Sequence, residues 1–355
     1  MNGYLFPESR ATGAASTGTA NPGVPQFAKI VAVASALPER RVLNQEIIAA
    51  HGHGVTATGM RQIVGVSERR VAEQGVADSD LLAAAARRCL EQAELEPREL
   101  SKLIVTKFLG DRLLPMTASV LQRKLGCDVA IQAYDIDGGT HAFLQALDAA
   151  ECCIATGDGP ILISSGGVIN CLVSKHDPHI AFTYGDGAAA VLMKPTSERH
   201  VLSTYFFSNH EFADSVTGFA LHEDLLRRAH DPQQYHLLHE LYRPKDWRSS
   251  KAFVLEAVEQ TVDSLTKDAG ISRTDVNLYL ISATHHRLWL AILDQLGITA
   301  ADTVSVLPDL GNTMSAMLPM GLDLALRSGR VGPGSLVMLL SVGEGASGGG
   351  MLVRL

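Results

Sequence analysis

Short apolar runs alternate with amphipathic stretches from Lys29 to the end of the chain. Apolar runs of strand length indicate buried strands, whereas apolar residues three and four positions apart indicate helices. In the first half of the chain this pattern predicts two helices, at 81–93 and about 140–156, and strands at 30–36, 103–108, 129–136, 161–164 and 188–193. Strands that alternate with helices in this way are typical of an α/β fold.

The second half of the chain repeats the order of the first at an offset of about 170 residues. The segment 94–104 has its counterpart at 270–280, and the pair Leu125-Gly126 has its counterpart at 296–297. A predicted strand, a short turn and a helix occur around Thr140 and again around Asn312. This repeat predicts two similar halves, 29–197 and 198–355, related by a pseudo-twofold axis, after a flexible Gly-, Ala- and Ser-rich arm at 1–28.

Thr140 and Asn312 occupy equivalent strand-to-helix junctions in the two halves. Ligands of open α/β sheets bind outside the carboxyl ends of the strands, where the N-termini of helices point. The free N–H groups and the dipole of a helix N-terminus favour negative charge that develops during a reaction. These two positions are therefore the first candidates for a site.

Composition and charge exclude several classes of partner. The chain has 355 residues, 46% of them hydrophobic, and a net charge of −8. Such an acidic balance does not suit nucleic acid or an anionic membrane. No apolar stretch is long enough to span a bilayer, and the N-terminus lacks the pattern of a secretory signal. An odd number of cysteines without a C-x-x-C pair suits a reducing cytoplasm, so we expect a cytoplasmic protein.

No metal site is expected, although five histidines crowd one region of the sequence. The spacing of these histidines matches no zinc motif; they are His210, His222, His230, His236 and His239. Two further matches to motifs are accidental. Gly185–Ala190 resembles a dinucleotide loop, but a strand-like segment follows it, and Gly345–Gly349 resembles a hydrolase elbow, but no histidine follows it.

Five segments in order resemble the β-ketoacyl-ACP synthase III branch of the thiolase superfamily. They are Asp135-Ile-Asp-Gly-Gly-Thr-His-Ala-Phe143, Tyr184-Gly-Asp-Gly-Ala-Ala-Ala190, His285-His-Arg-Leu288, Leu310-Gly-Asn-Thr-Met314 and Val342-Gly-Glu-Gly-Ala-Ser-Gly-Gly-Gly350. The resemblance covers almost all of residues 29–355 and implies the five-layer α-β-α-β-α thiolase fold. It also implies acyl transfer by a Cys–His–Asn triad, a homodimer formed through the first half, and a phosphopantetheine-bound acyl thioester as substrate without any cofactor.

Carried over by position, the resemblance assigns the catalytic histidine to His285 and the catalytic asparagine to Asn312. It assigns the oxyanion hole to the N–H groups of Gly345 and of the elbow residue. At the elbow the sequence departs from the family, because Thr140 stands where the family has cysteine. A hydroxyl needs a base to become a nucleophile, and a β-methyl group crowds its approach to a carbonyl.

Thr140 therefore has two interpretations. It is either a nucleophile with His285 as its base, or an N-cap that bonds the N–H of Phe143 and helps to position substrate. The neighbouring residues Asp137, His141 and His286 are possible site-lining residues, and Asp137 either orients an imidazole or caps the turn.

The resemblance places the family's aromatic and arginine clamp for the adenine of coenzyme A at Gly59 and Ile63 in this chain. Neither residue stacks on a base or pairs with phosphate, so a carrier protein is expected to be a better donor than acyl-CoA. An acidic carrier needs a local basic patch. The candidates for this patch are Arg61, Arg69, Arg70, Arg227 and Arg228.

Three functions stay open. The first is an acyltransferase of specialised metabolism that moves an acyl group from a carrier-protein or CoA thioester to a small-molecule acceptor. It works through acyl-Thr140 or by direct attack with His285 as base, and in the direct route the acceptor is a hydroxyl or an amine. The second is a decarboxylase of malonyl-type thioesters, in which His285 and Asn312 stabilise an enolate. The third is a non-catalytic partner of another ketosynthase.

Overall fold

The computed structural model describes residues 26–212 and 247–355, apart from Leu109, Leu113, Gly138, Ser174, Pro178, His179 and the segment 344–346. The strands are β1 Phe27–Ala36, β2 Arg41–Leu43, β3 Glu68–Arg70, β4 Lys102–Lys107, β5 Gln132–Asp137, β6 Ile161–Gly167, β7 Gly187–Thr196, β8 Val201–Ser208, β9 Leu278–Ser282, β10 Leu336–Val342 and β11 Ser347–Arg354. The helices are α1 Asn44–His51, α2 Ala57–Val64, α3 Asp78–Gln92, α4 Thr117–Leu125, α5 Ala142–Ala155, α7 Trp247–Ala269, α8 His286–Leu296, α9 Leu307–Leu310 and α10 Met317–Arg327. Short 3₁₀ turns lie among them, including η1 Pro97–Glu99, η2 Gly139–His141, η6 Arg273–Asp275 and η8 Met314–Ala316.

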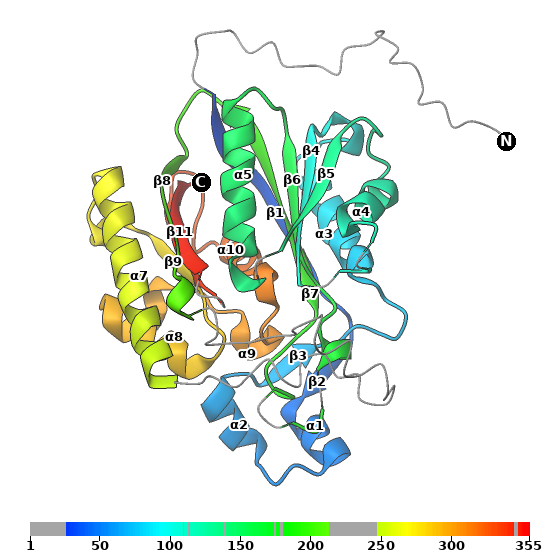
Figure 1. Cartoon of the computed structure of the whole chain (residues 1–355), viewed down its shortest axis with the longest axis vertical. Coiled ribbons are helices and arrows are strands. Elements are labelled where there is room, and N and C mark those ends of the chain that lie inside the picture. Colours follow the sequence, from blue (N-terminus) through cyan, green and yellow to red (C-terminus); the bar gives the residue numbers. More distant parts are fainter. Residues whose placement is uncertain are drawn as a thin grey trace, which may run out of the picture.

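Two mixed sheets form the frame of the molecule (Figure 1). The first has the strand order β1-β7-β6-β4-β5 and the second has the order β8-β11-β10-β9. In both sheets the first two pairs of neighbouring strands are antiparallel, whereas the pairs β6·β4 and β10·β9 are parallel. The repeat predicted from the sequence is therefore visible as the same strand order and the same strand directions in both sheets.

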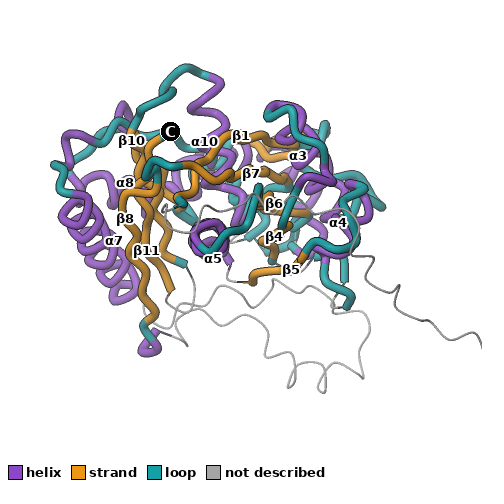
Figure 2. Tube along the Cα trace, turned by 90° about the horizontal axis from the view of Figure 1, so that it is seen from above, coloured by secondary structure: helices purple, strands orange, loops and turns teal. Residues whose placement is uncertain are grey.

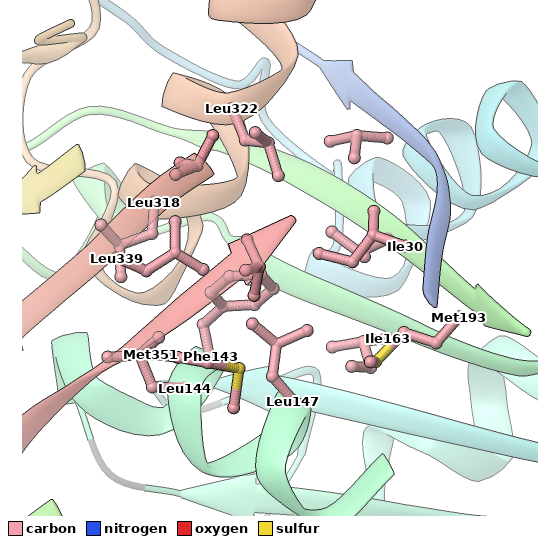
Figure 3. Close-up of a cluster of buried hydrophobic side chains, with 14 of the residues drawn as sticks. Ile30, Phe143, Leu144, Leu147, Ile163, Met193, Leu318, Leu322, Leu339 and Met351 are labelled. Carbon is pink, nitrogen blue, oxygen red and sulfur yellow. The ribbon is translucent and has the colours of Figure 1, made fainter. Parts of the chain in front are cut away.

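Helices α5 and α10 fill the layer between the two sheets, as Figure 2 shows from above. Their apolar side chains pack against strands of both sheets, and ten members of this cluster are labelled in Figure 3, among them Phe143, Leu147, Leu318 and Leu322. Burial of each such side chain stabilises the fold by about 1.5–3 kcal/mol. Helices α3 and α4 cover the outer face of the first sheet, and α7 and α8 cover that of the second. This five-layer arrangement is the expected thiolase fold.

Two sequence expectations about the ends of elements need correction. The first strand begins at Phe27, so the last two residues of the expected arm belong to the sheet, and residues 1–25 lie outside the described part of the chain. The segment before Asn312 is the short helix α9 and not a strand. Among the described residues, a single parallel bridge between Tyr279 and Thr303 lies where the first sheet has the strand β5. Pro308 explains this difference, because proline suits the first turn of a helix but cannot donate to a sheet.

Candidate active site

Thr140 lies in the turn η2, between the end of β5 and the start of α5. Its side chain is buried, and its Oγ1 has no hydrogen-bond partner among the described residues. The N-cap of α5 is His141, so the expectation that Thr140 caps this helix through Phe143 is wrong. A Cβ built at Gly343 would lie 3.0 Å from Thr140 Oγ1, so glycine at position 343 is what lets β10 end against this hydroxyl.

His285 follows β9 and caps the N-terminus of α8. Its Nδ1 accepts the N–H of Leu288 at 3.2 Å, so the neutral ring carries its proton on Nε2. Burial is the main cause that lowers the pKa of His285 to about 4, and nearby cationic groups, Arg287 first, lower it further. At neutral pH the imidazole is therefore uncharged and presents an N–H donor at Nε2. In this tautomer it is not a general base.

Asn312 is fully buried, and its backbone is tied to a neighbouring loop on both sides. Its N–H donates to Thr183 O at 2.8 Å, and its own carbonyl accepts the N–H of Gly185 at 3.1 Å. The side-chain Oδ1 accepts the N–H of Met314 at 2.8 Å. This bond fixes the amide orientation, and Nδ2 has no hydrogen-bond partner among the described residues. The Nδ2 group of Asn312 is thus a buried donor that no described residue occupies.

The fold brings these three residues to one end of the two sheets. Ser282, three residues before His285, pairs with Ser341 in the neighbouring strand β10. Two residues further along, Gly343 meets Thr140. The turn η2 that holds Thr140 packs against η8, which begins two residues after Asn312. The site therefore forms where the ends of β5, β9 and β10 meet two short turns.

The other candidate residues have structural partners. The Asp137 side chain is 63% exposed and forms an ion pair with Lys107 at 3.3 Å, and no bond to an imidazole is seen in the described part of the chain. His286 stacks on Trp289 with ring centroids 5.7 Å apart. His286 also packs against Gly65, where a Cβ would lie only 2.3 Å from that of His286. Gly345 lies outside the described residues.

His141 faces the second sheet. Its ring packs edge-on against Phe206 of β8 at 5.4 Å, and its Nδ1 has no partner in the described ranges. Burial lowers the pKa of His141 to about 4. Because this is below the unfolded value, the unfolded chain takes up the proton first as the pH falls.

The variant His141→Leu should therefore change how stability depends on pH. Wild type should lose about 2 kcal/mol of unfolding free energy relative to the variant between pH 7.5 and pH 5, because the buried ring resists protonation. Urea unfolding of both proteins across this range measures the difference. Parallel curves would show that His141 is protonated equally in both states.

The residues proposed for binding the acyl donor lie in different environments, some exposed and some buried. Gly59 and Ile63 lie on α2, which packs against α8, and Ile63 is 45% exposed. Arg61 is exposed. Arg69 is fully buried, which rules it out of a surface patch. The side chain of Arg70 is bonded to the carbonyls of Pro38 and Glu39, while Arg227 and Arg228 lie outside the described residues.

Sequence reasoning missed Asp186, although it quoted the motif that contains this residue. Asp186 is fully buried and accepts N–H groups from Ala72, Ile169 and Asn170. It also borders a cavity of about 530 Å³, and Met314 and Ser315 are among the other residues that line this cavity. The sequence did contain a signal for this role, namely a carboxylate between two glycines in an otherwise apolar run. Such a carboxylate is typical of a side chain that holds loops through their backbone N–H groups.

All five cysteines are free, and Cys152 and Cys153 lie near the far end of α5 from Thr140. In the part of the chain that the structure describes, no group of three or more His, Cys, Asp or Glu side chains is arranged to hold a metal ion. Nor does any described helix have the length and apolar character needed to cross a membrane.

Comparison with known proteins identifies the family of the chain. Residues 134–210 match the family "3-Oxoacyl-[acyl-carrier-protein (ACP)] synthase III", and residues 266–355 match its C-terminal counterpart. A β-ketoacyl-[acyl-carrier-protein] synthase III of Syntrophomonas wolfei is 30% identical over 332 residues, which cover 92% of this chain and 97% of the relative.

Solved structures show the same fold at lower sequence identity. The synthase III of Aquifex aeolicus superposes with a TM-score of 0.82 at 22% identity, over 92% of this chain and 100% of that chain. A priming β-ketosynthase of a polyketide biosynthetic pathway superposes with a TM-score of 0.81 at 23% identity, over 93% and 97% of the two chains. With nearly full coverage and 30% identity to a named synthase, this chain belongs to the β-ketoacyl-[acyl-carrier-protein] synthase III family.

Proposed function

We propose that this protein is an atypical acyltransferase in which Thr140 replaces the family's catalytic cysteine. The acyl donor is a phosphopantetheine thioester on a carrier protein or on CoA, and the acceptor is a small molecule with a hydroxyl or an amine. His285, Asn312 and Thr140 form the catalytic group, and the N–H groups of Thr140 and Gly345 form the oxyanion hole. The relatives are named as ketoacyl synthases and one structural neighbour as a priming ketosynthase of polyketide biosynthesis, which supports a role in specialised metabolism.

The orientation of two donors is the observation that carries this proposal. The Nδ1 of His285 is occupied as an acceptor, which places a proton on Nε2. The Oδ1 of Asn312 is also occupied, which leaves the Nδ2 group to donate. Two donors in a buried site suit a carbonyl oxygen that gains negative charge, and such donors act most strongly where water is excluded.

The same orientation favours direct transfer to an amine. Because no described residue is hydrogen-bonded to Thr140 Oγ1 as a base, the proposed acceptor attacks as a neutral nucleophile. The amine nitrogen bonds to the thioester carbon, and the C=O electrons move to the oxygen. This oxygen accepts hydrogen bonds from His285 Nε2–H and Asn312 Nδ2–H. The attacking nitrogen is now a positively charged ammonium. The C–S bond then breaks, and a proton passes from this nitrogen to the departing pantetheine thiolate. The products are an amide and a free thiol.

A second candidate is the decarboxylation of a malonyl-type thioester, because the same two donors suit an enolate. The bond to the carboxylate breaks, CO₂ leaves, and the electron pair is delocalised onto the thioester oxygen between His285 and Asn312. A proton from water then gives the acetyl thioester. This route needs no nucleophile at position 140. The lack of a hydrogen-bonded base at Thr140 among the described residues therefore supports this route as much as direct transfer.

The assembly that we propose is a cytoplasmic homodimer joined through the first half. Strand β5 ends its sheet, so its outer edge is unpaired among the described residues. Unprotected sheet edges tend to pair with another chain. Val129, three residues before β5, is 91% exposed, and Leu114, shortly before the helix α4 that packs against β5, is 82% exposed. Apolar residues at an interface would be exposed in this way in a single chain.

A competition between two acyl donors tests the proposed function. The same acyl group is supplied on a carrier protein and on CoA, with a panel of amines and alcohols, and the products are identified by mass spectrometry. We expect amide formation, faster with the carrier protein, because Gly59 and Ile63 offer no aromatic face and no charge to adenosine phosphate. Equal or faster turnover with acyl-CoA contradicts the carrier preference. CO₂ release from malonyl thioesters without transfer would establish the second candidate instead.

A further inference from the structure

Arg69 is a buried cation that has no hydrogen bond to a carboxylate in the part of the chain that the structure describes. It lies in β3 with 0% exposure, and its guanidinium donates to three neutral oxygens: Val42 O at 3.1 Å, Asn44 Oδ1 at 2.6 Å and Phe182 O at 2.8 Å. Its Nε has no partner among the described residues. Burial lowers the pKa of Arg69 to about 10, so the group stays charged at neutral pH. The charges of Glu68 and Glu46 oppose this lowering of the pKa, but a buried charge whose hydrogen-bond partners are all neutral is still costly.

The bond to Phe182 connects Arg69 to the loop that carries the Tyr184-Gly-Asp-Gly motif. Phe182 and Arg69 are 113 positions apart in sequence, so this is a tertiary contact and not a local turn. The side chain of Arg69 also lies beneath Gly185, where a Cβ would be 3.2 Å from that of Arg69 and 1.7 Å from Leu310 O. The loop at 182–185 is therefore held between Arg69 on one side and the chain before Asn312 on the other.

This loop in turn fixes the backbone of Asn312. Thr183 O accepts the N–H of Asn312, Gly185 N–H donates to its carbonyl, and Tyr184 forms a parallel bridge with it. The segment containing Arg69 also contacts the chain before Asn312, because Ser67 N–H donates to Pro308 O of α9 at 2.8 Å. Arg69 and its strand thus contact both the loop at 182–185 and the chain before Asn312, and the pairing of these two segments positions the Asn312 amide.

We propose that Arg69 is a positioning residue for the reaction, which holds Asn312 in place through the loop at 182–185. The inference rests on the proposed function, in which the Asn312 amide donates to the reacting carbonyl. A displacement of about 1 Å in a catalytic group costs up to 100-fold in rate. Loss of the guanidinium should therefore slow turnover more than it weakens substrate binding.

The test compares Arg69→Met with the matched control Arg41→Met. Arg41 lies in β2 of the same two-stranded ribbon, but it is exposed and pairs with Glu68. In Arg69→Met we expect kcat to fall by about 10- to 100-fold with KM for the donor changed less than about 3-fold. Hydrogen exchange of the Gly185 and Asn312 amides should become at least about 10-fold faster, and Arg41→Met should leave both measurements near wild type.

A double-mutant cycle with Asn312→Ala separates positioning from general stability. In the Asn312→Ala background, Arg69→Met should add less than about a 2-fold loss of kcat, while it lowers the thermal midpoint as much as in wild type. An equal loss of kcat in both backgrounds overturns the proposal, as does unchanged exchange of the two amides. If Arg69→Met does not fold, Arg69→Lys, which keeps the charge but not the planar fork, is measured in the same way and must show the same two changes in weaker form. If Asn312→Ala retains full activity, the proposed function fails, and the exchange experiment still decides whether Arg69 holds the loop.

Discussion

Replacing His285 by alanine should lower the rate of acyl transfer or decarboxylation by about 10²–10³-fold, the usual loss for one donor to a developing oxyanion. The reason is the ring orientation: Nδ1 is engaged by Leu288 N–H, so only Nε2–H can act on substrate. The loss should appear in kcat more than in KM, since the donor gains most when the oxygen becomes negative. Steady-state kinetics of the purified variant measure it.

The pH dependence distinguishes a donor from a base. Because the pKa of His285 is lowered to about 4, the ring stays neutral down to about pH 5. The contribution of His285 to the rate should therefore be constant from pH 5.5 to 8, and the ratio of wild-type to His285→Ala activity should not change across this range. A ratio that rises through pH 6–7 would instead show a histidine of ordinary pKa acting as a base.

A matched control is available for this variant. His200 is also a buried histidine, but it bonds the carbonyl of Arg354 at the edge of the second sheet. His200→Gln should affect stability without a large effect on kcat. If His285→Ala keeps most of the wild-type rate, the residue has no part in the chemistry. The hypothesis that the protein is a non-catalytic partner of another ketosynthase then gains support.

Thr140→Cys should turn a protein that does not acylate into one that does. A thiol at this position, beside a helix N-terminus, ionises far more readily than a hydroxyl, and it needs no separate base. Incubation with an acyl donor alone, followed by intact-protein and peptide mass spectrometry, should give a stable adduct on the variant's residue 140. Wild type should give none. The five native cysteines are present in both proteins and control for non-specific acylation.

Thr140→Val tests the position of Thr140 by stability, because a buried hydroxyl without a partner and an N-cap predict opposite changes in the free energy of unfolding. Thr140 Oγ1 is buried and has no bond to lose among the described residues, so removal of the hydroxyl should raise the unfolding free energy by about 1 kcal/mol. Loss of a cap would lower it by a similar amount. An acyl-threonine peptide in wild type that passes its acyl group to an acceptor would contradict the direct route.

The sequence alone predicted the parts of the fold that depend on local chemistry. Apolar runs placed the strands of the first sheet to within a few residues, and Gly126 and Gly297 end equivalent helices in the left-handed conformation that glycine favours. The repeat predicted two similar halves, and the structure shows them as sheets with a common strand order. Such features need only the periodicity of a segment and the conformational preferences of a few residues.

The tertiary structure decided the features that depend on contacts between distant segments. The sequence assigned Arg69 to a surface patch, because arginine is usually exposed, but the fold buries it beneath the loop at 182–185. It also left two roles open for Thr140, and only the position of the helix start excluded the cap. The tautomer of His285 is set by the backbone N–H of Leu288, which follows from the helix geometry and not from the residue type. Residue types and their spacing determined which side chains are candidates, whereas the protonation and accessibility of each depend on neighbours that only folding brings close.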